Sequence, residues 1–152
     1  MKNLCAVGLL VACILAFQSI TAQQPVTQKP VLNTKAYTLT QLPQKLPCNV
    51  TALQKLSLRA RLENVTMPFG DFEFTGQVID KVQRSAGVLS MNIRSTNIPG
   101  AMFTISVITD ANNTQKMVGR IINPKSDEVL VLTEENNQYF LVKQPREFFM
   151  TE

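Results

Sequence analysis

The side chains that could do chemistry in this chain are mostly carboxylates, because the sequence contains no histidine. Its absence excludes the Ser-His-Asp and Cys-His nucleophilic arrangements and the usual ligand sets of zinc hydrolases. Asp71 and Glu73 are two residues apart and would share one face of a strand. Such a pair could serve glycoside hydrolysis, but Arg59 and Arg61 are its expected neighbours, which favours ordinary cross-strand charge pairing. We therefore predict a protein that is not an enzyme and uses no metal or cofactor.

The first 22 residues have the organisation of a secretory signal peptide. A charged start is followed by an apolar run over residues 4–17 and then by small and polar residues up to Ala22. The run has 14 residues, whereas a membrane-spanning helix needs about 20. We predict a secreted, extracytoplasmic protein that is cleaved after Ala22. Residues 10–13 also match a lipoprotein cleavage pattern, so a lipid anchor on Cys13 is the alternative.

Cysteine chemistry is limited in the predicted mature protein. Cys5 and Cys13 belong to the signal segment, which leaves only Cys48. A single cysteine cannot form an intramolecular disulfide, so a hydrophobic core must supply the stability. Cys48 is then a covered free thiol, which is the simpler interpretation, or a reactive or intermolecular one.

Positive charge is concentrated near the N-terminus. Residues 23–62 carry six lysine or arginine side chains and no acidic one. Residues 23–50 also contain four prolines, which fix the backbone and remove amide donors, so we predict a basic, extended tail there. Such a tail suits an acidic partner, an anionic glycan or a membrane surface, although a solvated tail without a partner is the simpler interpretation. Nucleic acid is not expected, because no aromatic and basic stacking platform is evident.

Downstream of the tail, apolar residues recur at every second position, which is typical of half-buried strands. Strands are predicted over residues 56–62, 72–78, 89–93, 103–107, 116–122, 128–133, 138–144 and 146–151. Turn-forming residues separate them, and the short connections leave no room for crossover helices. We predict one all-β domain over residues 51–152, an antiparallel up-and-down meander of about eight strands that forms a small barrel. A two-layer β-sandwich is the alternative.

In such a meander, successive turns lie at opposite ends. One end then collects the domain's prolines, Pro68, Pro99, Pro124 and Pro145, and the other end is polar. Proline-stiffened loops lose less entropy on binding, and methionine and aromatic side chains are favoured interface anchors. We therefore predict that protein-binding loops are formed by Met67, Pro68, Phe69, Ile98, Pro99 and Met102. The alternative is that these tips fold back over the barrel mouth.

The later strands are apolar at consecutive positions, as in residues 129–132 and 139–142. Their outer face must be covered by the tail, by a second sheet or by a partner. Cover within the chain is the simpler expectation, and a dimer through strands in residues 116–142 is the alternative. Glycosylation patterns at Asn49, Asn64 and Asn112 matter only in a eukaryotic source.

A signal segment, a short tail and a compact meander over residues 50–152 resemble the organisation of small secreted bacterial β-barrel peptidase inhibitors, such as the potempins and staphostatins. The resemblance implies a non-enzymatic inhibitor of a secreted peptidase, with the loops at Met67 and Ile98 entering the cleft. The strand organisation also resembles that of lipocalins, which implies a small apolar ligand in the barrel, but their Gly-x-Trp signature is impossible without tryptophan. A structural envelope-associated module held by its basic tail is a further interpretation.

Overall fold

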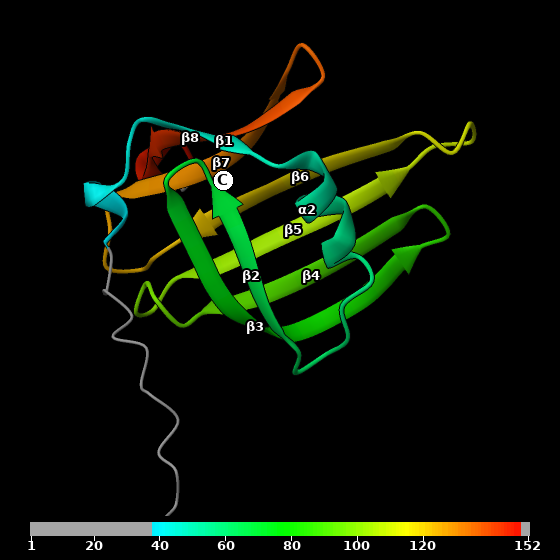
Figure 1. The fold of residues 1–152 in the computed structure, drawn as a ribbon, viewed down its shortest axis with the longest axis horizontal. Coiled ribbons are helices and arrows are strands. Elements are labelled where there is room, and N and C mark those ends of the chain that lie inside the picture. The colour runs from blue at the N-terminus through cyan, green and yellow to red at the C-terminus, as the bar shows by residue number, and fades with distance from the viewer. Residues whose placement is uncertain (1–37, 150–152) are drawn as a thin grey trace, which may run out of the picture. The chain divides into compact units, whose positions relative to one another are not determined.

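The computed structural model of the protein describes residues 38–149, so the predicted signal segment and most of the predicted tail lie outside the described residues. Eight strands close into an antiparallel barrel in which each strand pairs with the next and β8 pairs with β1 (Figure 1). The strands are β1 (Lys45–Cys48), β2 (Asn64–Phe69), β3 (Phe72–Ser85), β4 (Val88–Ser95), β5 (Met102–Thr109), β6 (Gln115–Ile122), β7 (Glu128–Glu135) and β8 (Gln138–Pro145). The described helical segments are η2 (Leu39–Gln41), α2 (Val50–Leu56) and η3 (Arg146–Phe149). None of the helices in the described part of the chain is long and apolar enough to cross a membrane. The predicted eight-stranded barrel is confirmed.

Period-two burial explains why these segments form a barrel with a filled interior. In β2, Val65, Met67 and Phe69 are buried and the residues between them are exposed, as in a strand with one face on the core. The rings of Phe69, Phe74 and Phe103 come from β2, β3 and β5, and their centroids lie 5.8–6.3 Å apart. An eight-stranded barrel is just wide enough for side chains to fill. The phenylalanines therefore occupy space that an interior ligand would need.

The predicted strand over residues 56–62 is wrong. The chain forms helix α2 as far as Leu56 and then an exposed turn. Leu53 and Leu56, three residues apart on one helical face, are buried. The Asn49 side chain caps the helix by accepting a hydrogen bond from the Ala52 amide at 2.9 Å. The apolar residues from Leu56 to Leu62 alternate as in a strand, but Leu56 is buried at the end of the helix, whereas Leu58 and Leu62 are exposed in the turn.

Three further segments differ from the prediction. Residues 67–69, predicted as a loop, belong to strand β2. Strand β1 lies inside the predicted tail of residues 23–50, so the barrel begins before the predicted boundary. Residues 146–149 form η3 where the last strand was predicted. The two missed strands, β1 and β2, balance the two wrong strands, so the total stays at eight. Each turn from β2 onward therefore lies at the end of the barrel where it was predicted.

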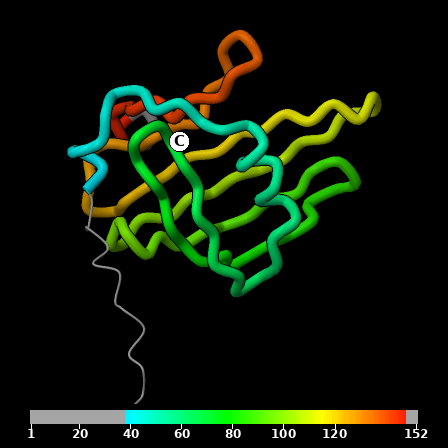
Figure 2. Tube along the Cα trace, in the orientation of Figure 1, coloured from blue at the N-terminus to red at the C-terminus, as the bar shows by residue number. Residues whose placement is uncertain are grey.

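Antiparallel pairing of successive strands brings every second connection to the same end of the barrel. One end of the barrel lies beside η2 (Figures 1 and 2). It is formed by the β2–β3 turn, residues 96–101 between β4 and β5, and residues 123–127 between β6 and β7. It also receives the end of β8 and the residues before β1, because these two strands are antiparallel. The prolines at or near this end are Pro43, Pro47, Pro68, Pro99, Pro124 and Pro145. A proline-rich end therefore exists.

The apolar outer face of the later strands is partly covered within the chain. Val129 is only 1% exposed, and η2 contacts β7. Val118 in β6 and Ile108 in β5 remain 39% and 36% exposed. Dimerisation through strands in residues 116–142 stays a prediction.

Candidate functional site

The proline-rich end contains the predicted binding residues, but the apolar side chains of β2 do not face solvent. Met67 and Phe69 are each 1% exposed and belong to the core. Pro68 lies between them on the outward face and is exposed. The prediction of an apolar loop tip at these residues is wrong, because the segment is a strand whose apolar side chains fill the barrel.

The position of Pro68 explains why a strand resembles a turn in the sequence. Phe69 and Phe72 flank a two-residue turn, so Pro68 and Glu73 form the next, non-hydrogen-bonded pair of the hairpin. The proline nitrogen then faces away from β3, towards the side where β1 pairs with β2 only through Cys48 and Phe69. The missing amide costs no bond to β3, which is the circumstance in which a sheet tolerates proline.

The second predicted loop is also anchored in the core. Ile98 is 0% exposed, Met102 is half-buried at the start of β5, and Pro99 is exposed. The carbonyl oxygen of Pro99 accepts a hydrogen bond from Nδ2 of Asn123 at 3.0 Å, which joins the β4–β5 connection to the β6–β7 connection. Of the six predicted residues, the exposed ones are Pro68 and Pro99.

A buried asparagine that the sequence analysis missed fixes the β4–β5 connection. Asn97 is 3% exposed. Its Oδ1 accepts hydrogen bonds from the Thr75 amide and the Ser95 hydroxyl, both at 3.1 Å, and its Nδ2 donates to the Glu73 carbonyl at 2.5 Å. A buried amide whose oxygen and nitrogen both form hydrogen bonds holds one orientation. In the sequence, Asn97 looks like any turn asparagine.

A groove of about 520 Å³ lies at this end of the barrel. One wall is formed by residues 41–43 and 45–47, and the other by residues 70–72. The buried side chains of Leu42, Leu46 and Phe72 contribute to its lining, together with exposed residues of both charges, Lys45 and Asp71. The groove is therefore apolar in part and charged at its edges.

The groove coincides with the seam at which the barrel closes. Strand β1 pairs with β8 over four residues, but its pairing with β2 consists of Cys48 opposite Phe69. The β2–β3 turn packs closely on β1, since a Cβ atom on Gly70 would lie 3.1 Å from Cδ of Pro47. Gly70 also has a φ of +60°, which glycine adopts at little cost. The turn is thus held against the wall beside the groove.

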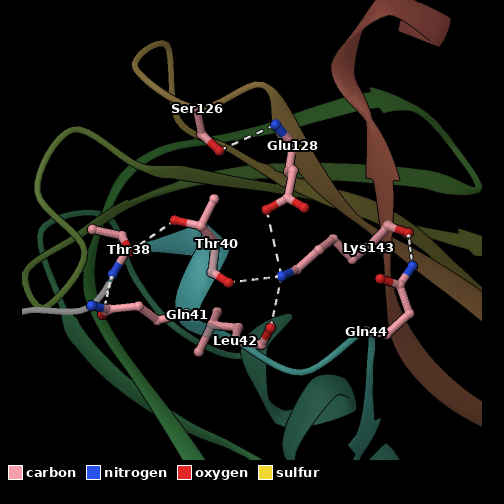
Figure 3. Close-up of polar contacts among 8 residues, drawn as sticks. All are labelled: Thr38, Thr40, Gln41, Leu42, Gln44, Ser126, Glu128 and Lys143. Atoms are coloured by element: carbon pink, nitrogen blue, oxygen red, sulfur yellow. Dashed lines mark hydrogen bonds and ion pairs between the residues drawn. The ribbon is translucent and has the colours of Figure 1, made fainter.

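Residues 38–44, here named the strap, are fastened by Lys143 of β8 (Figure 3). Lys143 is 9% exposed, and its Nζ donates to the carbonyl oxygens of Leu42 at 2.7 Å and Thr40 at 3.1 Å. The backbone of Lys143 also donates to the Gln44 carbonyl at 2.9 Å and accepts from Nε2 of Gln44 at 2.7 Å. One residue of β8 therefore holds three residues of the strap.

Glu128 of β7 completes the contacts of this lysine. Its Oε2 lies 3.4 Å from Nζ of Lys143 (Figure 3). Among the described residues, no group forms a hydrogen bond with this buried oxygen, so the contact is an ion pair without hydrogen-bond geometry. The carboxylate and the two strap carbonyls together offset the cost of burying the lysine charge.

Cys48 lies in β1 and is partly buried. Desolvation raises the pKa of its thiol to about 12, and a backbone hydrogen bond with Leu141 opposes the rise only in part. The thiolate is the nucleophilic form of cysteine, so this group is a poor nucleophile at neutral pH. The interpretation of Cys48 as a covered thiol fits the structure.

The predicted pairing of Asp71 and Glu73 with Arg59 and Arg61 is wrong. Arg59 forms an ion pair with Glu63, and Nε of Arg61 donates to a backbone carbonyl of β3 at 3.1 Å. Asp71 and Glu73 are exposed. Within residues 38–149, no three acidic or cysteine side chains are placed to hold a metal ion.

No protein-family model, curated protein or solved structure matches this chain. Its function is therefore inferred from the chemistry and geometry of the proline-rich end.

Proposed function

We propose that the protein is a non-enzymatic binding protein that accepts a segment of a protein partner in the groove at the proline-rich end. The observation that carries this proposal is a groove of about 520 Å³ whose walls are fixed before any partner arrives. Lys143 holds the strap on one side, and Gly70 packs against Pro47 on the other. Pre-organised walls reduce the ordering cost of association.

A protein segment suits the groove because the lining combines two kinds of surface. Pro43 and Pro47 offer exposed apolar surface for a side chain, and Asp71 can pair with a positive charge, whereas Lys45 is already paired with Glu135 at 2.6 Å. Interfaces commonly combine an apolar centre with a polar rim in this way. The exposed Pro99 of the neighbouring connection adds stiff contact surface at the same end.

The narrower form of the proposal is that the partner is a secreted peptidase and that binding inhibits it. This form rests on the predicted export signal and on the architecture that resembles small barrel inhibitors. The structure changes how inhibition would work, because Met67 and Ile98 are buried. The enzyme would contribute a surface segment to the groove, while the rim around Pro68 and Pro99 would obstruct its cleft.

The test uses Asp71→Trp, which places a large side chain in the groove from an exposed turn position. Val118→Trp is the matched control on the outer face of β6, where the side chain is 39% exposed. Serine, cysteine and metallopeptidases secreted by the source organism are assayed with each variant, and stable complexes are sought by size-exclusion chromatography. We expect binding by the parent and by Val118→Trp and its loss in Asp71→Trp. A complex that forms without inhibiting the peptidase would contradict the proposal of inhibition. A complex that Asp71→Trp forms as well as the parent would contradict the proposal that the groove is the binding site.

A second candidate is a carrier of a small apolar ligand, and the size of the groove favours it. Ligand pockets usually measure about 300–1,000 Å³, and the groove falls within that range. Because Phe69, Phe74 and Phe103 fill the interior, the ligand would occupy the groove and not the barrel lumen. Native mass spectrometry of the purified protein distinguishes the candidates: a bound small molecule that Asp71→Trp displaces would support the carrier.

A further inference from the structure

Residues 57–63, here named the leucine turn, expose apolar side chains that the fold does not use. Leu58 is 80% exposed and Leu62 is 65% exposed. The other exposed large apolar residues among those described, Ile108 and Val118, reach only 36% and 39%. Two leucines in one short turn thus form the most exposed apolar feature of the described chain.

Leu62 is unsuited to its backbone position as well as to its surroundings. Its φ is +70°, and the Glu63 amide donates to the Ala60 carbonyl at 3.2 Å, so Leu62 occupies the third position of a tight turn. A positive φ at that position is typical of a type II turn and normally selects glycine. A bulky side chain there is an outlier whose cost the surrounding structure must offset. Neither packing nor backbone geometry explains a leucine at this position.

The leucine turn is held rigidly against β3. Nζ of Lys81 donates to the carbonyl oxygens of Ser57 at 2.7 Å and Arg59 at 2.9 Å. The Leu62 amide donates to the Val78 carbonyl at 2.7 Å. These bonds hold the turn on β3 while both leucine side chains stay exposed to solvent, so their exposure is a property of the fold.

Basic side chains surround the two leucines. Lys55, Arg59 and Arg61 are exposed, and Lys81 is bound beneath the turn. The acidic residue of the turn, Glu63, is already paired with Arg59. Because Glu63 offsets Arg59, the net positive charge near the leucines comes from Arg61 in the turn, from Lys55 at the end of α2 and from Lys81 of β3.

We propose that the leucine turn docks on an anionic lipid bilayer, with Leu58 and Leu62 entering the interface and the arginines contacting headgroups. A short turn cannot by itself supply the roughly 800 Å² that each partner buries in a standard protein interface. Shallow insertion needs only a few apolar side chains and complementary charge. The stems of Arg59 and Arg61 can lie along the apolar layer while their charges stay at the headgroups.

The docking surface and the groove are separated by strand β2. The leucine turn precedes Asn64, and the groove borders the turn that follows Phe69. A six-residue strand spans about 20 Å. A protein docked through the turn therefore keeps its groove away from the bilayer, and the two proposals can fail independently.

The experiment uses tryptophan fluorescence, because the chain contains no tryptophan of its own. Leu58→Trp reports from the turn, and Val118→Trp is the matched reporter on the outer face of β6. Both full-length proteins are titrated with vesicles of zwitterionic lipid alone and with vesicles containing about 30% anionic lipid. Every variant has the same N-terminal residues, so their contribution cancels in the comparison.

We expect emission from Leu58→Trp to move to shorter wavelength with anionic vesicles and to be quenched by lipids brominated on their acyl chains, while Val118→Trp does not respond. In the Leu58→Trp background, Arg61→Gln should weaken binding about fivefold. Leu62→Ala should weaken binding about tenfold, because it removes three apolar carbons from a side chain that would be partly buried in the bilayer interface. Arg61→Lys keeps the charge and Lys125→Gln removes a distant one, so both should bind like the parent.

An unchanged Leu58→Trp spectrum, or an equal response from Val118→Trp, would overturn the proposal. An equal response to zwitterionic vesicles would overturn the role of charge. A shift to shorter wavelength that grows with protein concentration in the absence of vesicles would show that a second copy of the chain covers the turn, and would also overturn it.

Discussion

Replacing Lys143 with methionine tests whether one lysine fastens the strap. Methionine keeps an unbranched apolar stem of similar length but removes the charge and all three donors. The Leu42 and Thr40 carbonyls then lose their contacts at 2.7 and 3.1 Å. The Glu128 carboxylate loses the partner 3.4 Å away.

The contacts set the size of the expected effect. A hydrogen bond from a charged donor contributes about 1.5–3 kcal/mol, but removing the ammonium also removes its desolvation penalty, which is several kcal/mol. Breaking a buried pair by deleting one partner usually costs about 3–5 kcal/mol. Oε2 of Glu128 is buried, but the side chain as a whole is 32% exposed, so the freed carboxylate can turn towards water, and we expect the lower limit, about 3 kcal/mol. Lys143→Met combined with Glu128→Gln should recover about 1 kcal/mol of this loss by removing the unpaired charge.

Urea denaturation followed by circular dichroism measures the loss. With a slope of about 2 kcal/mol per molar urea, the midpoint should fall by about 1.5 M. Hydrogen exchange of the Leu42 amide, which donates to the Leu39 carbonyl at 3.1 Å, should accelerate because the strap opens locally. Lys125→Met, an exposed lysine at the same end, is the control and should stay within about 0.5 kcal/mol of the parent. A Lys143→Met protein with parental stability and unchanged strap exchange would refute the reasoning.

Other predictions concern single side chains. Cys48 should resist iodoacetamide at pH 7 and react only after unfolding, because burial raises its pKa to about 12; peptide mass mapping detects the adduct, and rapid native labelling would contradict the prediction. Tyr139→Phe should cost about 1–2 kcal/mol in urea denaturation, because Oη of Tyr139 accepts a hydrogen bond from the buried Met117 amide at 3.1 Å; an unchanged midpoint would count against this bond. Leu62→Gly should stabilise the protein by about 0.5–1 kcal/mol, since relief of about 1–2 kcal/mol of left-handed strain exceeds the added entropy of unfolded glycine; a clear loss of stability would mean that the leucine packs. The pKa of Glu63 is lowered, first by its hydrogen bond with the backbone at Ala60 and then by Arg59, so its contribution to the turn should be complete above about pH 4.5 and disappear as the pH falls through the lowered pKa; NMR titration of the carboxyl would show an unshifted pKa if the bond is absent.

The sequence predicts the barrel well because the required information is local. Period-two burial in β3 to β8 and the turn residues between them are visible within windows of ten residues. Asn136 and Asn137, for example, both have positive φ, as a tight hairpin turn requires. The strand predicted over residues 56–62 is wrong for the same reason, because a short window cannot distinguish a strand from a helix end and an exposed turn whose leucines alternate.

The candidate site is much harder to predict because its contacts join distant parts of the chain. The strap resembles a proline-containing tail until Lys143, about 100 residues later, is placed beneath it. A faint signal does exist: Tyr139, Leu141 and Lys143 continue one inward-facing period in β8, so the lysine occupies a core position. Pro68 leads to the wrong prediction of a loop, because proline normally argues against a strand. Its position in the β2–β3 hairpin is one where the strand tolerates it.

The pairing of β1 with β8 has a consequence for how the barrel folds. Six of the other strand pairs are hairpins of successive strands, and such local hairpins form within microseconds. The remaining pair, β1 with β2, is separated by α2 and consists of Cys48 opposite Phe69. The β1–β8 pair joins residues 91 to 97 positions apart, from Cys48 opposite Tyr139 to Lys45 opposite Val142, and long-range closure of this kind is slow. Because a chain is synthesised from its N-terminus, β1 is made first and its partner β8 is made last. The first strand made must wait for the final one before the barrel, and with it the groove, can exist.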